Sequence, residues 1–142
     1  MKIVDTNVLL YAVDEHSARH SAARTWLDAA LSGSESIGFA WSVLLGFVRL
    51  STNRAIAARP LNVDEAIAVT QSWLARPPSL LLEPNAEHLG TLRDLLGPIG
   101  TAGNLVADAH LAAHALEYAA EVVSFDADFG RFPGVRWRRP GE

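Results

Sequence analysis

The sequence predicts an α/β fold with a central, mainly parallel sheet of about five strands flanked by helices. Short apolar segments bounded by turn residues recur along the chain, as buried strands do. Most neighbouring segments are separated by a stretch of helical periodicity. Parallel strands need such crossovers, because the chain must return to the same end of the sheet before the next strand starts. The predicted strands are residues 2–4, 37–40, 80–82, 122–125 and, at an edge, 135–137.

Two of these strands end in carboxylates. The first runs directly into Asp5-Thr6-Asn7, a polar triplet that is interpreted as a turn, and Asp126 follows the fourth strand. Ligands of open α/β sheets bind beyond the carboxyl ends of the strands. Both aspartates are therefore expected at the binding edge of the sheet.

The helices are predicted from apolar periodicity and from residues that begin or end a helix. Gly33 ends the first helix, and Ser42 is expected to cap the second. Asn62 and Glu65 form a capping-box pattern for a third helix, which ends before Pro77. The five helices are expected at residues 17–31, 42–52, 62–76, 86–96 and 104–118.

The length and the composition of the chain restrict the class of protein to which it can belong. Residues 1–142 are expected to form a single domain, because about 150 residues is a usual size for one folding unit. With 49% hydrophobic and 20% charged residues, the chain can bury a core. It contains no apolar run of membrane-spanning length and no signal-peptide pattern, so a cytoplasmic location without membrane attachment is expected. Cysteine is absent, which leaves oxygen and imidazole as metal ligands.

The formal net charge of −4 argues against a protein that binds nucleic acid through general basicity. Lys2 is the only lysine, so local positive charge comes from arginine, whose planar fork suits phosphate. The C-terminal arginines form either a phosphate-contacting edge or a solvated tail. They are Arg131, Arg136, Arg138 and Arg139.

Asp108 lies on the apolar, small-residue face of the last predicted helix, where a charge is costly unless it is paired or binds a cation. Helix-dipole stabilisation in the first turn is the alternative. Asp5, Asp126 and Asp128 would converge on it, and two carboxylates about 4 Å apart repel by roughly 4 kcal/mol at an effective dielectric near 20. Such acids share protons or hold a hard cation such as Mg²⁺ or Mn²⁺, which favours metal-assisted phosphodiester hydrolysis.

A phosphatase that uses Asp5 as a nucleophile is a weaker interpretation. Position 7 is Asn where a second Asp would be needed, and no lysine is available apart from Lys2.

Four segments together resemble the PIN-domain family, and more closely its VapC-type toxins. The resemblance implies a PIN-like sandwich and RNA cleavage that depends on Mg²⁺ or Mn²⁺. It also implies that the chain is the toxin of a type II toxin–antitoxin system, with a small VapB-type antitoxin as its partner, and that it forms a homodimer. It maps the family's metal-binding acids onto Asp5, Asp108 and Asp126, with Asp128 as an auxiliary catalytic acid. Thr6, Asn7 and Ser124 would orient these acids. The segments are residues 3–7, 47–49, 103–113 and 123–129.

Gly46 departs from the family pattern, which usually has Glu at this position. Close backbone approach or room for another ligand would favour a helical glycine here. Three alternatives follow: Asp128 compensates, Asn104 contributes an amide oxygen, or catalysis is lost. In the last case the chain would be a degenerate PIN-like protein that binds RNA or an antitoxin without cleavage.

Several other residues are given lesser roles. His110 and His114 lie about 200° and 240° around the helix from Asp108, so they are expected to be solvated or interface residues, and His88 is interpreted as isolated. The helix at 42–52 has more apolar surface than one core contact needs, which favours contact with another chain. Arg49 and Arg54 are further candidates for contacts with RNA phosphate or with an acidic antitoxin tail.

Overall fold

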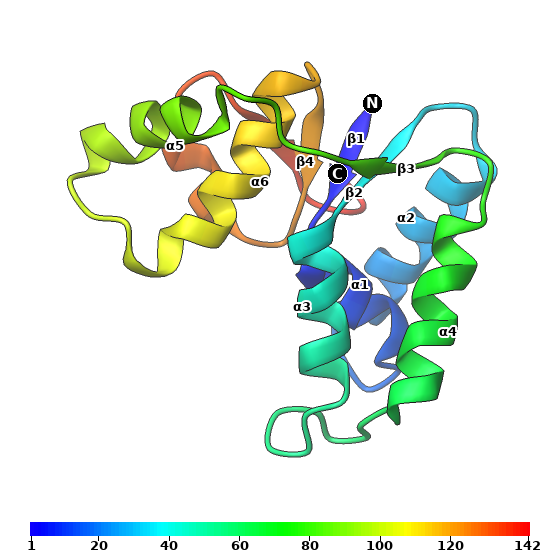
Figure 1. Ribbon diagram of the computed structural model, residues 1–142. Coiled ribbons are helices and arrows are strands. Elements are labelled where there is room, and N and C mark those ends of the chain that lie inside the picture. The colour runs from blue at the N-terminus through cyan, green and yellow to red at the C-terminus, as the bar shows by residue number, and fades with distance from the viewer.

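The computed structural model describes residues 1–142, which form a five-stranded sheet in the order β3-β2-β1-β4-β5 (Figure 1). All four strand pairings are parallel, so the predicted α/β class is confirmed. The strands are β1 (Lys2–Val4), β2 (Ile37–Ala40), β3 (Ser79–Leu82), β4 (Glu121–Val123) and β5 (Arg136–Arg138).

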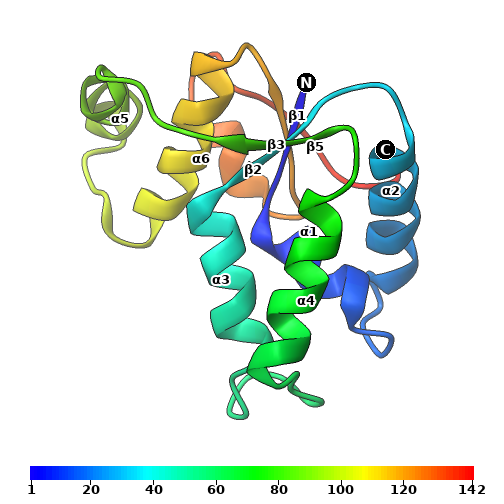
Figure 2. The same cartoon turned by 45° about the vertical axis from the view of Figure 1, so that its right-hand side comes forward.

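Six α-helices surround the sheet in two groups. In both views α5 and α6 lie together at one side of the sheet, and α1 to α4 form the other group (Figures 1 and 2). None of the helices combines the length and apolar composition that crossing a membrane requires. The helices are α1 (Thr6–Val13), α2 (His20–Ser32), α3 (Trp41–Ser51), α4 (Val63–Leu74), α5 (His88–Leu96) and α6 (Val106–Glu117); short 3₁₀ turns cover Gly97–Ile99, Gly103–Leu105 and Ala127–Arg131.

The prediction of a turn at Asp5-Thr6-Asn7 is wrong, because α1 begins at Thr6. Asp5 caps this helix: its side chain accepts a hydrogen bond from the Thr6 amide. Val8 and Leu9 then turn into the core, which stabilises a helix where the polar triplet alone indicated a loop.

Other helix starts also differ from prediction, since α2 begins at His20 rather than at residue 17 and α5 at His88 rather than at residue 86. Ala40, not Ser42, is the cap residue of α3, and no side chain caps that end. The residues at 103–105 form a 3₁₀ turn before α6, with Gly103 at a φ of 42° that favours glycine. The Asn62–Glu65 capping box of α4 is confirmed.

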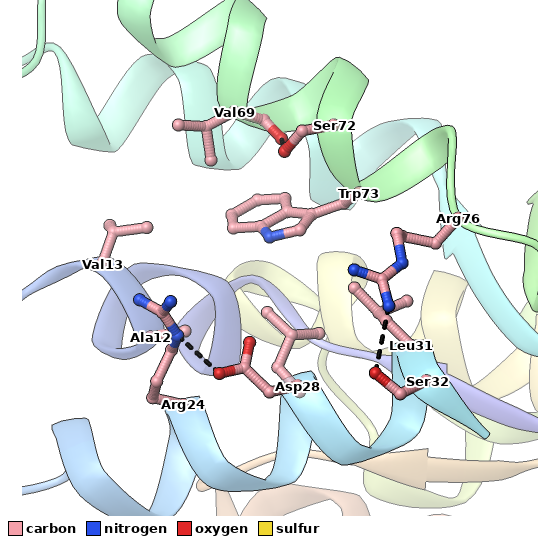
Figure 3. A pocket seen from close by; sticks show the side chains of 11 residues that line it. Ala12, Val13, Arg24, Asp28, Leu31, Ser32, Val69, Ser72, Trp73 and Arg76 are labelled. Atoms are coloured by element: carbon pink, nitrogen blue, oxygen red, sulfur yellow. Dashed lines mark hydrogen bonds and ion pairs between the residues drawn. The ribbon is translucent and has the colours of Figure 1, made fainter.

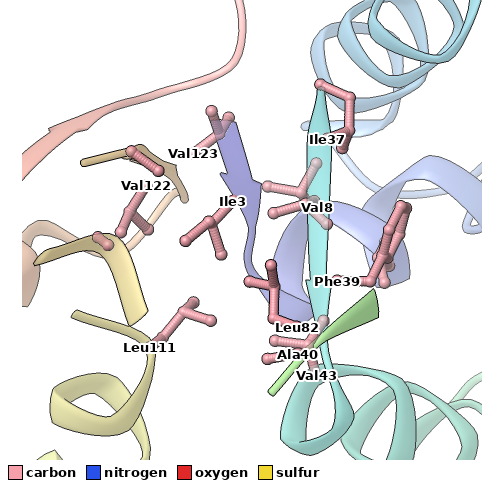
Figure 4. Packing of buried hydrophobic residues seen from close by; sticks show 14 of the residues in the cluster. Ile3, Val8, Ile37, Phe39, Ala40, Val43, Leu82, Leu111, Val122 and Val123 are labelled. Atoms are coloured by element: carbon pink, nitrogen blue, oxygen red, sulfur yellow. The ribbon is translucent and has the colours of Figure 1, made fainter. Parts of the chain in front are cut away.

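The core lies on both faces of the sheet. Ile3 and Val122 point towards Leu111 of α6, whereas Phe39 and Val8 lie on the side of α1 (Figure 4). Each large apolar side chain that is fully buried stabilises the fold by about 1.5–3 kcal/mol.

Strand β2 approaches its neighbours closely through a glycine. A Cβ atom at Gly38 would lie 2.9 Å from Leu82 Cδ1 and 3.2 Å from Ile3 Cγ1. A larger residue at this position would force the side chains of Leu82 on β3 and Ile3 on β1 to move within the close-packed core, which favours glycine.

The direction of chain progression reverses beside β1. Strands β2 and β3 extend the sheet to one side of β1, and the chain then returns to place β4 on the other side. At such a switch point the loops after β1 and β4 leave in opposite directions and open a crevice at the carboxyl ends of the strands. Asp5 and Asp126 lie in these two loops.

Candidate functional site

Asp5 is held rigidly by hydrogen bonds from both strand ends. Its Oδ1 atom accepts from the Thr6 amide at 2.7 Å, and its Oδ2 atom accepts from Ser124 Oγ at 2.6 Å and Asn7 Nδ2 at 3.1 Å. Burial nevertheless raises the pKa of Asp5, which the Ser124 and Thr6 hydrogen bonds only partly offset. The carboxylate is therefore well oriented, but its charge favours a nearby cation.

Ser124 and Asn7 connect the ends of β1 and β4. The Ser124 hydroxyl also accepts from Asn7 Nδ2 at 3.0 Å and from the Asp126 amide at 2.9 Å, while Asn7 Oδ1 accepts from the Phe125 amide at 3.1 Å. Both residues orient the acids as expected. The Thr6 side chain instead faces α3, where its Oγ1 lies 3.5 Å from the carbonyl oxygen of Val43.

Three aspartates form the acidic triad: Asp108, Asp126 and Asp128 each offer a carboxylate oxygen, and these atoms lie within 4.8 Å of one another. Asp126 is fixed because it caps the 3₁₀ turn at Ala127–Arg131 and accepts from the Asp128 amide at 2.9 Å. Asp108 accepts no hydrogen bond. The triad does not include Asp5, but Asp5 lies close enough for its charge to act on Asp108.

Desolvation raises the pKa of Asp108 to about 7, and the charges of Asp5, Asp126 and Asp128 add to the effect. Repulsion of this kind is what a divalent cation would relieve. The ligand set consists of carboxylate oxygens, as hard ions such as Mg²⁺ and Mn²⁺ prefer, and two of the three carboxylates, Asp108 and Asp128, accept no hydrogen bond. The residues present therefore fit such an ion.

Gly46 lies against Thr6, the first residue of α1. A Cβ atom at Gly46 would be 3.2 Å from Thr6 Oγ1 and 3.4 Å from Thr6 Cγ2, which is a tight contact. Close approach of the two helices thus accounts for glycine at this position. Of the residues considered as replacements for the usual Glu, Asp128 belongs to the triad, whereas Asn104 is exposed and makes no hydrogen bond.

The interpretation of the histidines was wrong in two respects. His88 is not isolated, because its ring lies 4.8 Å from that of His110 and 5.1 Å from that of His114. His114 is not solvated, since only 1% of it is exposed. The sequence contained a signal: positions 110, 114 and 117 recur at helical spacing.

Most of the C-terminal arginines already have partners within the chain. Arg138 pairs with Glu121, and Arg136 donates to the carbonyl oxygen of Ala119 at 3.1 Å. Arg131 lies 3.8 Å from Asp128 and is thus the C-terminal arginine next to the triad. Arg19, which the sequence did not single out, lies 5.1 Å from the ring centre of Phe125, beside the loop that carries Asp126.

Two other surface features adjoin the helices. An open pocket between α1, α2 and α4 contains none of the four aspartates; Val69, Ser72 and Trp73 of α4 face Arg24, Asp28 and Ser32 of α2 across it (Figure 3). On α3, Trp41 is 48% exposed and Leu45 is 62% exposed, in accordance with the excess apolar surface expected of that helix.

Comparison with known proteins shows which family and which structures this chain resembles. The model of the PIN domain family matches residues 2–135. Ribonuclease VapC37 of Mycobacterium tuberculosis is 52% identical over 140 residues, which cover 99% of this chain and 97% of that protein. The structure of VapBC-1 from nontypeable Haemophilus influenzae has a TM-score of 0.70 at 16% identity, covering 99% and 98% of the two chains. Mycobacterium tuberculosis VapC20, a Sarcin-Ricin loop cleaving toxin, has a TM-score of 0.66 at 17% identity, covering 96% and 99%.

Proposed function

Because this chain belongs to the PIN domain family, we propose that it is a metal-dependent endoribonuclease and the toxin of a VapBC-type toxin–antitoxin pair. The observation that carries the proposal is the meeting of Asp5 with the acidic triad at the crevice between β1 and β4. RNA is the substrate, and the cytoplasm is the proposed site of action.

Asp108, Asp126 and Asp128 would hold the ion, with Asp5 as a further ligand or as the acid beside it. Mg²⁺ or Mn²⁺ bound there would supply a Lewis acid for the phosphodiester and lower the pKa of an attacking water. The remaining roles belong to the chain. Ser124 and Asn7 hold Asp5 in one orientation, so little reorganisation is needed when substrate binds.

Positive charge around the triad would orient the RNA. Arg131 and Arg19 lie beside Asp128 and Phe125 respectively, so their guanidinium groups can contact phosphates on either side of the cleaved bond. The negative net charge makes these local contacts the main electrostatic attraction for RNA.

Cleavage of RNA by matched variants tests the proposal. Purified protein with Mg²⁺ or Mn²⁺ should cut RNA, and Asp5→Asn and Asp108→Asn should each lower the rate at least about 100-fold, as loss of one preorganised charged group does. Asp28→Asn is the control, because Asp28 forms an exposed ion pair with Arg24 away from the triad. Products that persist in both site variants would show that the activity belongs to a contaminant.

Gly46 supports one alternative, a degenerate PIN protein that binds without cutting, because the family's usual Glu is absent. The same assay separates the two functions. No metal-dependent product from the wild-type chain, together with RNA binding that survives Asp108→Asn, would favour the binding protein.

The pocket between α1, α2 and α4 is the proposed docking site for a segment of the VapB-type antitoxin. Leu27, Leu31 and Trp73 contribute apolar lining to it, and Arg76, which also lines it, has no carboxylate partner. Val69→Glu should weaken the complex with the cognate antitoxin at least about tenfold while RNA cleavage is retained. Ile67→Glu, an exposed position outside the pocket on the same helix, is the matched control.

A homodimer through the exposed face of α3 is also proposed. Trp41 and Leu45 would bury their apolar surface against a second copy of the chain. Light scattering should report a dimer for the wild-type protein and a monomer for Leu45→Glu; a wild-type monomer at high concentration would contradict the dimer.

A further inference from the structure

A second group of metal-ligating side chains lies between α5 and α6. It consists of His88, at the start of α5, together with His110, His114 and Glu117 of α6, and we call it the histidine cluster. At about 100° per residue, these positions of α6 lie roughly 180° to 240° around the helix from Asp108. The cluster and the acidic triad therefore occupy opposite faces of the same helix.

Glu117 lies between two of the imidazole rings. Its Oε1 atom contacts Nδ1 of His88, and its Oε2 atom lies 3.2 Å from Nδ1 of His114. On the other side of the His88 ring, Nε2 lies 2.8 Å from Nδ1 of His110. His88, His114 and Glu117 each offer a ligand atom, and these atoms lie within 4.8 Å of one another.

The cluster is almost closed to solvent. The side chains of His114 and Glu117 are 1% and 6% exposed, and that of His88 is 10% exposed. His114 Nδ1 and Glu117 Oε2 are fully buried, and neither has a hydrogen-bond partner. An unsatisfied buried polar atom destabilises the folded state, and more so when the group is charged.

A cation is the partner that satisfies both atoms. The Nδ1 atom of His114 is buried and lies 3.2 Å from Glu117 Oε2, so a cation between them would have a ligand on each side. No lysine or arginine side chain pairs with the buried carboxylate of Glu117. Two imidazoles and one carboxylate form a ligand set that zinc accepts in proteins, whereas Mg²⁺ prefers oxygen alone.

We propose that His88, His114 and Glu117 bind a divalent transition metal of the zinc type, separate from the ion of the acidic triad. His110 would accept a hydrogen bond from the second ring nitrogen of His88 and thereby fix the orientation of that ligand. Tetrahedral ligands of zinc are about 3.4 Å apart, so the three side chains need only small shifts to close around the ion. The metal would link α5 to α6, the helix that carries Asp108.

Metal content measured under competition tests the site. The protein is equilibrated with Zn²⁺ in excess Mg²⁺, which occupies oxygen ligands, and then washed and analysed for zinc. About one equivalent should remain in wild-type protein and in Asp108→Asn, whereas His88→Gln and Glu117→Gln should each retain roughly a tenth or less. His16→Gln, at an exposed histidine outside the cluster, should bind zinc like the wild type.

Substitution with Co²⁺ gives a measurement that does not depend on the stability of the variants. Imidazole-bound Co²⁺ in wild-type protein should give visible absorption bands of a four-coordinate site and strongly shifted, exchangeable imidazole proton signals. Absence of these signals, or zinc retention that Asp108→Asn abolishes, would overturn the proposal. The latter result would leave a single metal site at the triad.

Discussion

Asp108 differs from Asp5 and Asp126 because its carboxylate accepts no hydrogen bond, and from Asp128 because no arginine pairs with it. Asp5 and Asp126 accept hydrogen bonds from backbone amides, and Asp128 lies near Arg131. Unfavourable electrostatics therefore acts on Asp108, whose pKa is raised to about 7, as well as on Asp5, whose pKa is also raised by burial. Substitution of Asp108 should therefore raise the stability of the metal-free protein while it lowers the rate of RNA cleavage.

The free energy of unfolding of the metal-free protein should depend on pH through Asp108. Its folded pKa is raised from 3.8 to about 7, so the folded state binds the proton more tightly and stability falls as pH rises through that window. Asp108→Asn should remove this contribution and make the metal-free protein more stable at pH 8, by on the order of 1 kcal/mol after allowance for solvent screening.

Urea unfolding in EDTA at about pH 5 and pH 8 measures this difference. Wild type and Asp108→Asn should differ more at the higher pH. Equal stabilities at both pH values would show that the charge of Asp108 is not strained in the folded protein. Mg²⁺ should stabilise the wild type at pH 8 and have less effect on the variant.

Gly46 gives a second prediction at this scale. Gly46→Ala alone should raise the free energy of unfolding by less than the roughly 1 kcal/mol expected from helix propensity, because the new Cβ atom lies 3.2 Å from Thr6 Oγ1. In a Thr6→Ala background, Gly46→Ala should give the full increase in the free energy of unfolding. A double-mutant cycle by chemical denaturation should give a coupling of about 0.5–1 kcal/mol, whereas additivity within about 0.3 kcal/mol would contradict the contact.

Among the elements, α4 depends most visibly on local sequence. Asn62 Oδ1 accepts from the Glu65 amide at 2.8 Å, and Glu65 Oε1 accepts from the Asn62 amide at 3.1 Å. These bonds satisfy two of the amide groups that a helix start leaves unpaired. Phe47 of α3 packs edge-on against Trp73 of α4, with ring centres 4.9 Å apart, and completes the attachment of the helix.

Asn62→Ala should lower the free energy of unfolding by about 1 kcal/mol, and Asn62→Ser should retain most of it because serine also caps helices. Urea denaturation measures both. RNA cleavage by the folded variants should be unchanged, because α4 carries none of the four aspartates. A loss of cleavage in Asn62→Ala under conditions where it is folded would indicate that α4 positions the site.

For the molecule as a whole, the organisation of residues 1–142 as one domain is a prediction that unfolding can test. Trp26, Trp41, Trp73 and Trp137 lie on α2, α3, α4 and β5, so fluorescence reports on both halves of the sheet. If the chain is one cooperative unit, fluorescence and circular dichroism should give the same denaturation midpoint. Two separated midpoints would contradict a single cooperative unit.

Local chemistry made much of the fold predictable from the sequence. Apolar runs at β1, β2 and β4 and the capping box of α4 depend on near neighbours, which the sequence displays directly. Helix α1 was not predicted from the sequence. Its polar start resembles a turn, and only burial of Val8 and Leu9 against the sheet makes the helical form more stable.

The sequence by itself determined which residue types are available: carboxylates after two strands and on one helix, arginine in place of lysine, and no thiolate. It did not determine which side chains meet, because contacts between distant segments depend on strand order and helix packing. The predicted meeting of Asp108 with Asp126 and Asp128 is present in the tertiary structure, and the tertiary structure alone placed Gly46 against Thr6 and brought His88 to Glu117. Burial then decided their chemistry, since removing water is what raises the pKa of Asp108 and leaves His114 without a partner.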